Sequence, residues 1–266
     1  MKKTVLLFLS AITFSSIGVA GGDINLEPVA EPKVVESIEG WNFHFAPLFL
    51  WAMDTDGANT IGPVSVPLDV PFSDALENLD IAFTFHFEAN KGDWTLFTEY
   101  QYVKLEPSAD LPLGGSMGVD FKNYMFELGG AYTFSRSERS QWQGIGGLRY
   151  TKQKVKVTVT PALPTLPVLT PLNVSEDWTD FFVGLRNIYK ITDKWSLLSR
   201  ADIGAGGSDL VWNASMIADY RFNEWGSAFI GYKVMDYDYD NGERGLNTYA
   251  YDATLQGPVL GLNIHW

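Results

Sequence analysis

The stretch Leu79–Asn90 reads LDIAFTFHFEAN and places large apolar side chains at every second position, with Phe85 and Phe87 near its centre. Polar residues such as His86 and Glu88 occupy the positions between them. A period of two residues is typical of a β-strand with one apolar and one polar face. The stretch therefore predicts a strand that separates an apolar environment from a polar one.

Segments with the same alternation recur along the chain. They predict ten strands, at 42–53, 79–89, 94–105, 120–135, 141–158, 176–190, 195–205, 209–221, 225–239 and 250–266. Short and long links alternate between them, and aromatic residues recur near the segment ends, as in membrane barrels with lipid outside and a polar lumen. The predicted fold is all-β, a single antiparallel up-and-down transmembrane β-barrel of about ten strands. Barrels of eight or twelve strands and a soluble β-sandwich stay open as alternatives.

The N-terminal segment has the features of a secretory signal peptide. Lys2 and Lys3 precede an apolar run from Val5 to Val19, and the small residue Ala20 precedes Gly21. The run is shorter than the roughly twenty residues that a membrane-spanning helix needs. We therefore predict a signal peptide at 1–20, a periplasmic lead-in at 21–40 and an outer-membrane barrel at 41–266.

Composition excludes several classes of function. The chain has no cysteine, which removes disulfides, thiolate metal sites and cysteine nucleophiles. Without Lys2 and Lys3 it carries 17 basic against 32 acidic residues, a formal charge of −15. Such a charge repels a nucleic-acid backbone, so no nucleic-acid partner is expected. No cofactor is predicted either.

Long parts of the sequence resemble a widespread family of Gram-negative outer-membrane β-barrel proteins, of the kind of the small OmpA- and OmpW-like barrels. The matching stretches are WNFHFAPLFLWAM at 41–53, PFSDALENLDIAFTFHFEANKGDW at 71–94, DWTDFFVGLRNIYKITDKWSLLSRADIGAGGSDLVWNASMIADYRF at 177–222, GYKVMDYDYDNG at 231–242 and YDATLQGPVLGLNIHW at 251–266. A proline-rich insertion near 159–175 is the exception. The resemblance implies a location and a fold but no activity.

An outer-membrane location predicts three kinds of partner. These are the outer-membrane lipid with its lipopolysaccharide, the barrel assembly machinery, and a small solute whose identity the sequence does not give. Trp266 follows Leu260, Leu262 and Ile264 on one strand face and resembles the terminal aromatic of the outer-membrane assembly signal.

If apolar positions face lipid, the lumen receives charges of both signs in similar number. The expected polar network comprises His44, His86, Glu88, Glu99, Gln101, Glu127, Arg149, Arg186, Arg200, Asp202, Asp219, Arg221 and Lys233. Such charges must find partners if they fill a narrow barrel, because a buried charge without a partner costs several kcal/mol. The favoured interpretation is an internal salt-bridge network, and the alternative is a small polar conduit or ligand cavity.

The segment Pro71 to Leu79 predicts a helix of one or two turns, with Ser73 as its cap. It is a candidate plug that folds over or into the outer mouth of the barrel. The residues proposed for the plug are Phe72, Asp74, Leu76 and Glu77.

No set of catalytic or metal-binding residues emerges from the sequence. The omptin proteases use an aspartate–histidine couple, but no Asp-x-His occurs here, and none of the three histidines has a serine two residues away. His86, Glu88 and Glu99 lie within reach of one another across two strands, which suits a hydrogen-bonded lumen histidine better than an acid–base or metal cluster. The acidic run at 236–242 lacks the closing glutamate of a calcium loop.

The sequence therefore predicts a non-enzymatic, porin-like protein of the cell envelope, with a structural role or a role as a small-solute channel. An outer-membrane hydrolase of lipid or peptide, and an adhesion or ligand-binding barrel that acts through its outer loops, stay open as alternatives.

Overall fold

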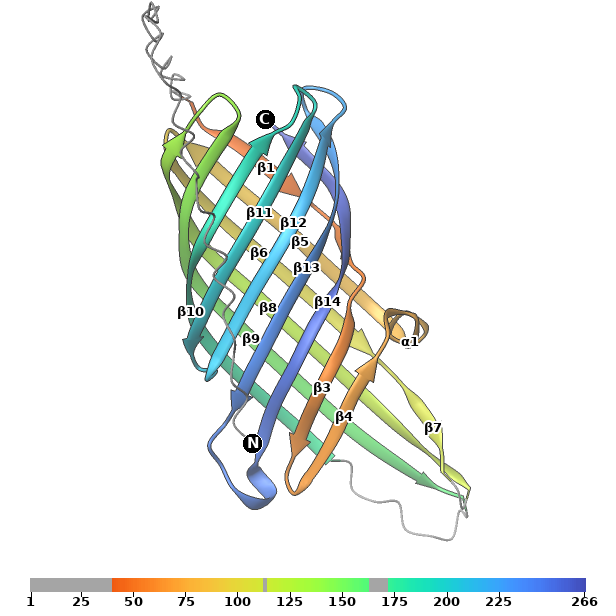
Figure 1. Ribbon diagram of the computed structural model, residues 1–266. Helices are drawn as coiled ribbons and strands as arrows, with labels where there is room; N and C mark the ends of the chain where they lie inside the picture. Colours follow the sequence, from red (N-terminus) through yellow and green to blue (C-terminus); the bar gives the residue numbers. More distant parts are fainter. Residues whose placement is uncertain (1–39, 112–113, 163–171) are drawn as a thin grey trace, which may run out of the picture. The chain divides into compact units, whose positions relative to one another are not determined.

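Ten antiparallel strands close into a barrel in the computed structural model, which describes residues 40–111, 114–162 and 172–266 (Figure 1). The ring comprises β1 (Asn42–Ala46), β5 (Leu79–Lys91), β6 (Trp94–Leu105), β8 (Gly115–Arg136), β9 (Ser140–Pro161), β10 (Leu172–Lys190), β11 (Trp195–Gly206), β12 (Leu210–Arg221), β13 (Gly226–Asp240) and β14 (Tyr249–His265). Pairing of β14 with β1 closes it. The predicted fold and its ten-stranded ring are confirmed, whereas the predicted signal peptide, the lead-in up to residue 39 and residues 163–171 of the proline-rich insertion lie outside the described residues.

The first predicted strand, at 42–53, is interrupted in the structure. Pro47, which has no backbone N–H to donate, separates β1 from β2 (Phe49–Trp51), and β3 (Asp54–Ile61) follows. All three pair with β14.

The region 54–78, a long link between the first two predicted strands, contains a hairpin and a helix. β4 (Val64–Val70) folds back on β3 through a two-residue turn that begins at Gly62, whose φ of 58° favours glycine. The helix α1 (Phe72–Glu77) follows. Two short elements complete the described chain: β7 (Ser108–Asp110), which pairs with β8, and the 3₁₀ helix η1 (Gly245–Asn247). None of the helices in the described ranges is long and apolar enough to cross a membrane.

The barrel closes at Phe43 and Trp266. The Phe43 amide donates to the Trp266 carbonyl at 2.9 Å, and the Trp266 amide donates to the Phe43 carbonyl at 3.2 Å. Their rings stack with centroids 5.5 Å apart. The two ends of the barrel sequence therefore hold each other at the end where the short turns lie, which is the periplasmic end in proteins of this fold.

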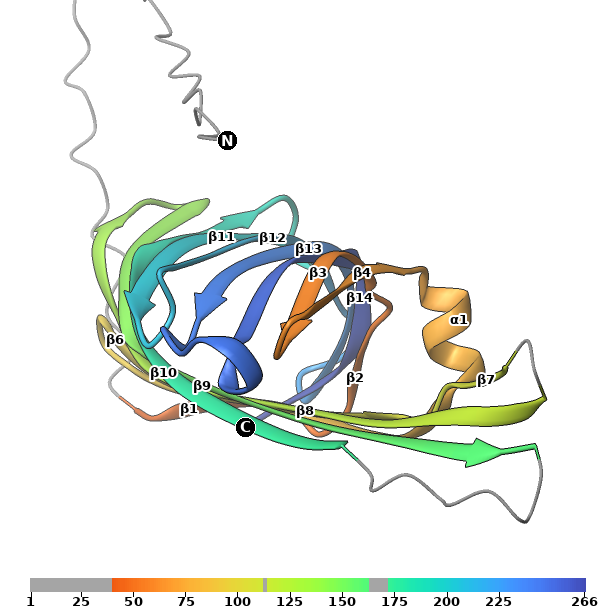
Figure 2. The ribbon, with the colours of Figure 1, turned by 90° about the horizontal axis from the view of Figure 1, so that it is seen from below.

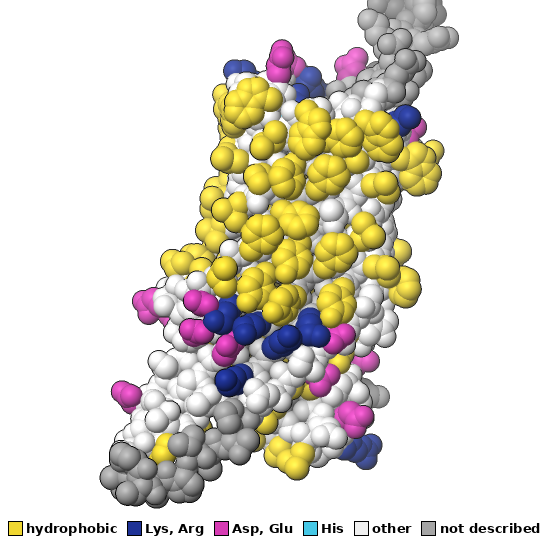
Figure 3. Space-filling view, turned by 180° about the vertical axis from the view of Figure 1, so that it is seen from behind, with side chains coloured by type: hydrophobic (Ala, Val, Ile, Leu, Met, Phe, Trp, Pro, Cys, Tyr) yellow, Lys and Arg dark blue, Asp and Glu magenta, His cyan; other side chains and the backbone are white. Residues whose placement is uncertain are grey.

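The outer wall carries a broad apolar surface (Figure 3). Phe181 and Val183 of β10 expose 71% and 64% of their surface, while Phe182 between them is buried. Exposed aromatic residues lie near the periplasmic ends of the strands, namely Trp41, Trp94, Tyr132, Trp142, Trp195, Trp225 and Trp266. An apolar belt bordered by aromatic residues is the surface that a lipid bilayer covers, so the fold is that of a transmembrane barrel.

Candidate functional site in the charged lumen

Two arginines and two carboxylates form a closed ring at the centre of the lumen. Arg149 places Nε 2.7 Å from Glu127 Oε1 and Nη2 2.8 Å from Asp202 Oδ1. Arg200 contacts the second oxygen of each acid, with Nη2 3.0 Å from Glu127 Oε2 and Nε 2.7 Å from Asp202 Oδ2. Each guanidinium therefore bridges both carboxylates. We call these four residues the central ring.

A second group of charges continues from the central ring towards β5 and β13. His86 lies between two carboxylates, with Nε2 3.1 Å from Glu88 Oε1 and Nδ1 3.1 Å from Glu99 Oε2. Arg186 contacts Glu88 on one side, and Lys233 Nζ lies 3.0 Å from Glu99 Oε1 on the other. Four basic and four acidic side chains therefore compensate one another through these two groups, with His86 between the acids.

Two phenylalanines pack among these charges. Phe97 and Phe182 are buried, with ring centroids 6.3 Å apart, and the guanidinium carbon of Arg200 lies 5.5 and 5.2 Å from the two rings. Contacts of this kind add to the stabilisation that the two carboxylates give the Arg200 cation. The packing requires glycine next to the rings, because a Cβ on Gly129 would lie 2.5 Å from Phe97 Cζ.

The structure brings most of the predicted network together. The central ring and the second group contain His86, Glu88, Glu99, Glu127, Arg149, Arg186, Arg200, Asp202 and Lys233, and Gln101 donates to Glu99. His44 and Asp219 lie in a separate cluster nearer the periplasmic end, and Arg221 is exposed. The network therefore has two parts along the barrel axis.

That separate cluster joins residues that sequence reasoning did not connect. Ser227 Oγ lies 2.6 Å from Asp219 Oδ2 and 2.8 Å from His265 Nε2, and the His265 ring meets the His44 ring edge-on at 4.7 Å. In a catalytic triad the acid orients the histidine, but here it contacts the serine. Ser227 is also fully buried. The arrangement therefore does not present an activated nucleophile to a substrate.

The outer half of the lumen is aromatic, which the sequence analysis missed. Trp178 stacks on Tyr239 at 4.0 Å, and Tyr237 and Tyr251 pack beside them. The alternation offers a signal that identifies them, because in β13 Tyr237 and Tyr239 share a face with the lumen residue Lys233.

Asp180 was missed for a related reason. Asp180 lies between Trp178 and Phe182 on the inner face of β10. Because the sequence analysis assigned apolar positions to the lipid side, it did not recognise this face as the lumen face. Asp180 is fully buried and accepts hydrogen bonds from the Ser208 amide at 2.7 Å and from Ser208 Oγ at 2.8 Å. It thus fixes the short link between β11 and β12.

The helix predicted as a plug forms, but it lies elsewhere. α1 contacts β3 and has no buried residue, and Leu76 is 53% exposed. Figure 2 shows it at the side of the β3–β4 hairpin rather than inside the ring of strands. The plug assignment of Phe72, Asp74, Leu76 and Glu77 is therefore corrected.

The local contacts explain this position. Asp54 Oδ1 accepts a hydrogen bond from the Phe72 amide at 2.6 Å, which ties the start of the helix to β3. The helix has Pro71 at its N-cap rather than Ser73, whose hydroxyl instead donates to Asp74. A helix of six residues also has little apolar surface to bury in a lumen.

The described residues contain no group of three or more histidine, aspartate or glutamate side chains arranged to hold a metal ion. What the lumen geometry can do chemically is to hold charge in place, because its cations and carboxylates pair with one another, while Arg149 Nη1 and Arg186 Nη2 are buried without a hydrogen-bond partner in the described part of the chain.

Comparisons with known proteins find distant structural likenesses alone. No family model matches the chain, and no curated protein matches it. Three similar solved structures are Ail, the attachment invasion locus protein of Yersinia pestis (11% identity, 86% of this chain and 100% of that one, TM-score 0.38), Neisserial surface protein A (11%, 84% and 96%, 0.33) and the outer membrane protease OmpT from Escherichia coli (7%, 88% and 99%, 0.41). All are outer-membrane β-barrels. Identities this low carry no role from one barrel to another, so the role must be argued from the lumen and the surface.

Proposed function

We propose that this chain is a non-enzymatic barrel of the outer membrane whose lumen is closed to solutes, and that it serves the cell envelope structurally, like the small OmpA- and OmpW-like barrels it resembles. The observation that supports this most is the central ring. Arg149 and Asp202 are fully buried, and Glu127 exposes 1% of its side chain.

A conduit for ions needs a water-filled path, whereas the central ring pairs each of its charges twice across the lumen. Opening a path requires breaking contacts that are expensive to lose, because a buried charge deprived of its partner destabilises a protein by about 3–5 kcal/mol. A barrel with a structural role keeps these contacts intact. Within the central ring, the same pairing leaves neither carboxylate free to act as a general acid or base.

The test is conductance in planar bilayers at low and high salt. The double variant Glu127→Ala with Arg149→Ala removes one ion pair and leaves Arg200 and Asp202 to pair with each other, so the net charge of the barrel is unchanged. The matched control is Glu243→Ala with Arg244→Ala, two exposed residues of the outer loop between β13 and β14.

We expect the natural protein and the control to stay silent and the lumen double variant to pass current. Deleting residues 72–78, which removes α1, is expected to leave the protein silent, because the helix lies beside the wall. Steady conductance of the natural protein would contradict a closed lumen and support the small-solute channel.

A further inference from the structure

Lysines replace the outward-facing aromatics where three neighbouring strands leave the apolar belt. Tyr102 of β6 and Tyr124 of β8 face each other with rings 4.8 Å apart, and the next outward positions are Lys104 and Lys122, again directly paired. Beyond Tyr150, β9 has three lysines at alternate positions. The lysine patch consists of Lys104, Lys122, Lys152, Lys154 and Lys156. Figure 3 shows basic side chains gathered along one border of the apolar face.

Three lysines of the patch have carboxylate partners on the same surface. Lys104 pairs with Asp80 and Glu106, Lys122 Nζ lies 3.4 Å from Asp120, and Lys152 Nζ lies 3.2 Å from Asp177. Lys154 and Lys156 differ, because no carboxylate in the described part of the chain lies within 4.0 Å of either Nζ atom. Both are exposed.

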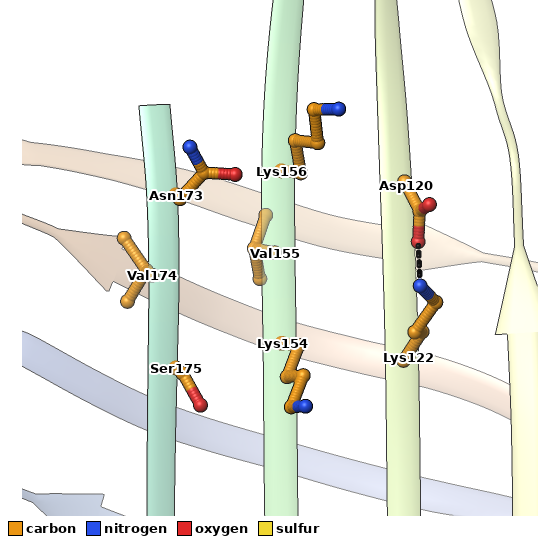
Figure 4. Close-up of a pocket in the computed structure, with 8 residues that line it drawn as sticks. All are labelled: Asp120, Lys122, Lys154, Val155, Lys156, Asn173, Val174 and Ser175. Atoms are coloured by element: carbon orange, nitrogen blue, oxygen red, sulfur yellow. Dashed lines mark ion pairs between the residues drawn. The ribbon is translucent and has the colours of Figure 1, made fainter. Parts of the chain in front are cut away.

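These lysines border a shallow pocket of about 310 Å³ on the outer wall (Figure 4). Asp120 and Lys122 of β8 and Lys154 and Lys156 of β9 lie around it, and β10 contributes Asn173 and Ser175. Three ammonium groups and the Ser175 hydroxyl, from three strands, therefore border one site, with the Asp120 carboxylate beside Lys122. Its ammonium and hydroxyl donors suit a phosphate group, which accepts several hydrogen bonds.

The position of the site relative to the membrane suggests which molecule carries the phosphate group. Tyrosines mark the border between the hydrocarbon and the headgroups, and the lysine patch lies directly beyond them at the outer end of the barrel. In a chain with 19 basic and 32 acidic residues, two exposed lysines that form no ion pair within the described part of the chain are a local exception. The opposite wall has Asp236, Asp238 and Asp252 facing outwards. The attraction for an anion is therefore confined to one side.

We infer that the lysine patch binds the phosphate groups of the glycolipid of the outer leaflet, lipopolysaccharide, with Lys122, Lys154 and Lys156 as the direct contacts. The inference rests on the outer-membrane part of the proposed function and not on the closed lumen. The lysine patch then holds a phosphorylated lipid against one side of the barrel.

The test measures binding of fluorescently labelled lipopolysaccharide to the full chain in phosphatidylcholine vesicles. Each lysine near an anionic headgroup is expected to contribute about fivefold in affinity, so the variant Lys122→Gln, Lys154→Gln, Lys156→Gln should bind about a hundredfold more weakly. The control with the same charge change is Lys91→Gln, Lys190→Gln, Lys194→Gln at the periplasmic end. It should bind like the natural protein, and a heat-dependent gel shift shows that each variant is a folded barrel.

Two further arms separate the sources of phosphate. Lipopolysaccharide whose lipid phosphates have been removed should bind the natural protein as weakly as the triple variant binds the intact lipid. Inorganic phosphate at millimolar concentration should displace little of the labelled lipid.

Unchanged affinity of the triple variant, or equal binding of the dephosphorylated lipid, overturns the inference. Displacement by inorganic phosphate would assign the pocket to a free anion and overturn the lipid as its occupant. A barrel that conducts but still binds the lipid through these lysines would refute the closed lumen alone.

Discussion

Arg149 on β9 reaches past β10 to Asp202 on β11, with Nη2 2.8 Å from the carboxylate Oδ1. The two residues are on strands that do not pair with each other. The reach is possible because Gly184 of β10, which lies directly opposite Asp202, has no side chain on the lumen face. Together with the contacts of Arg149 and Arg200 to Glu127, this links β8, β9 and β11 through the lumen as well as through the wall.

The first prediction concerns Arg149. Replacing it with methionine leaves two buried carboxylates with Arg200 as their shared partner, and we expect a loss of about 3–5 kcal/mol in the free energy of unfolding. Urea titration in lipid vesicles measures it. Arg136→Met is the control, because Arg136 pairs with Asp93 on the surface, where such pairs contribute about 0–1 kcal/mol. Equal losses for both variants would mean that the lumen ring stabilises no more than a surface pair.

The Arg149 contact can also be isolated by a double-mutant cycle. Adding Asp202→Asn to Arg149→Met removes the charge of a carboxylate that has lost one of its two arginine partners, so the double variant should lose less than the sum of the two single variants. Simple additivity within error would show that the two residues are not energetically coupled.

Gly184 gives the second prediction. A Cβ there would lie 2.2 Å from the Ala201 carbonyl oxygen and 2.6 Å from Asp202 Cβ, so Gly184→Ala must displace β11 or the central ring. We expect a loss of about 1–3 kcal/mol or more. Gly144→Ala is the control, since nothing lies within 4 Å of a Cβ built there. If urea midpoints fall equally for both, close packing at Gly184 is not the cause.

Much of this fold follows from the sequence because alternation has a period of two. Once Phe85 is assigned to lipid, His86 must face the lumen, and the same reasoning places Glu127 and Arg149 there. Which acid meets which base does not follow, because it depends on the stagger between strands. The pairing of Arg149 with Asp202, two strands away, illustrates this.

The aromatic outer lumen was missed because the rule of apolar residues facing lipid fails beyond the membrane. In the outer part of β13 the outside is water, so Asp236 and Asp238 face outwards while Tyr237 and Tyr239 pack inside. The β3–β4 hairpin was missed because Gly62 and Pro63 signal a turn without showing that Val64–Val70 returns along β3.

The third prediction concerns Thr84 of β5, which continues the contact between β1 and β5 as far as β2. Backbone pairing of β1 with β5 ends at Ala46 and His86. Beyond it, Thr84 Oγ1 accepts a hydrogen bond from the Phe49 amide at 2.9 Å and donates to the Phe49 carbonyl. In Thr84→Val both contacts are lost, and we expect a destabilisation of about 1–3 kcal/mol.

Hydrogen exchange read at single amides checks this. The Phe49 amide should exchange faster in the variant, while the Phe97 amide within the β6–β8 ladder should keep its rate and serves as the internal control. A Phe49 amide that stays protected would show that Thr84 does not hold β2 against β5.

The fourth prediction separates two roles of Trp266, which we predict to be read by the barrel assembly machinery. Its backbone and ring close the barrel against Phe43, so Trp266→Ala removes a structural contact as well as a signal. In cells, we expect the variant to yield much less heat-modifiable, folded protein in the outer membrane than the natural chain. Trp225→Ala, which removes a similarly exposed tryptophan at the same end, should assemble normally.

Refolding the purified variant into lipid vesicles without any assembly factor decides between the two roles. A signal read by the machinery affects only assembly in cells, so Trp266→Ala should refold in vesicles to nearly the natural yield. A structural contact matters wherever the barrel forms. If refolding in vesicles is as impaired as assembly in cells, Trp266 acts through its contact with Phe43, and its role as an assembly signal is refuted.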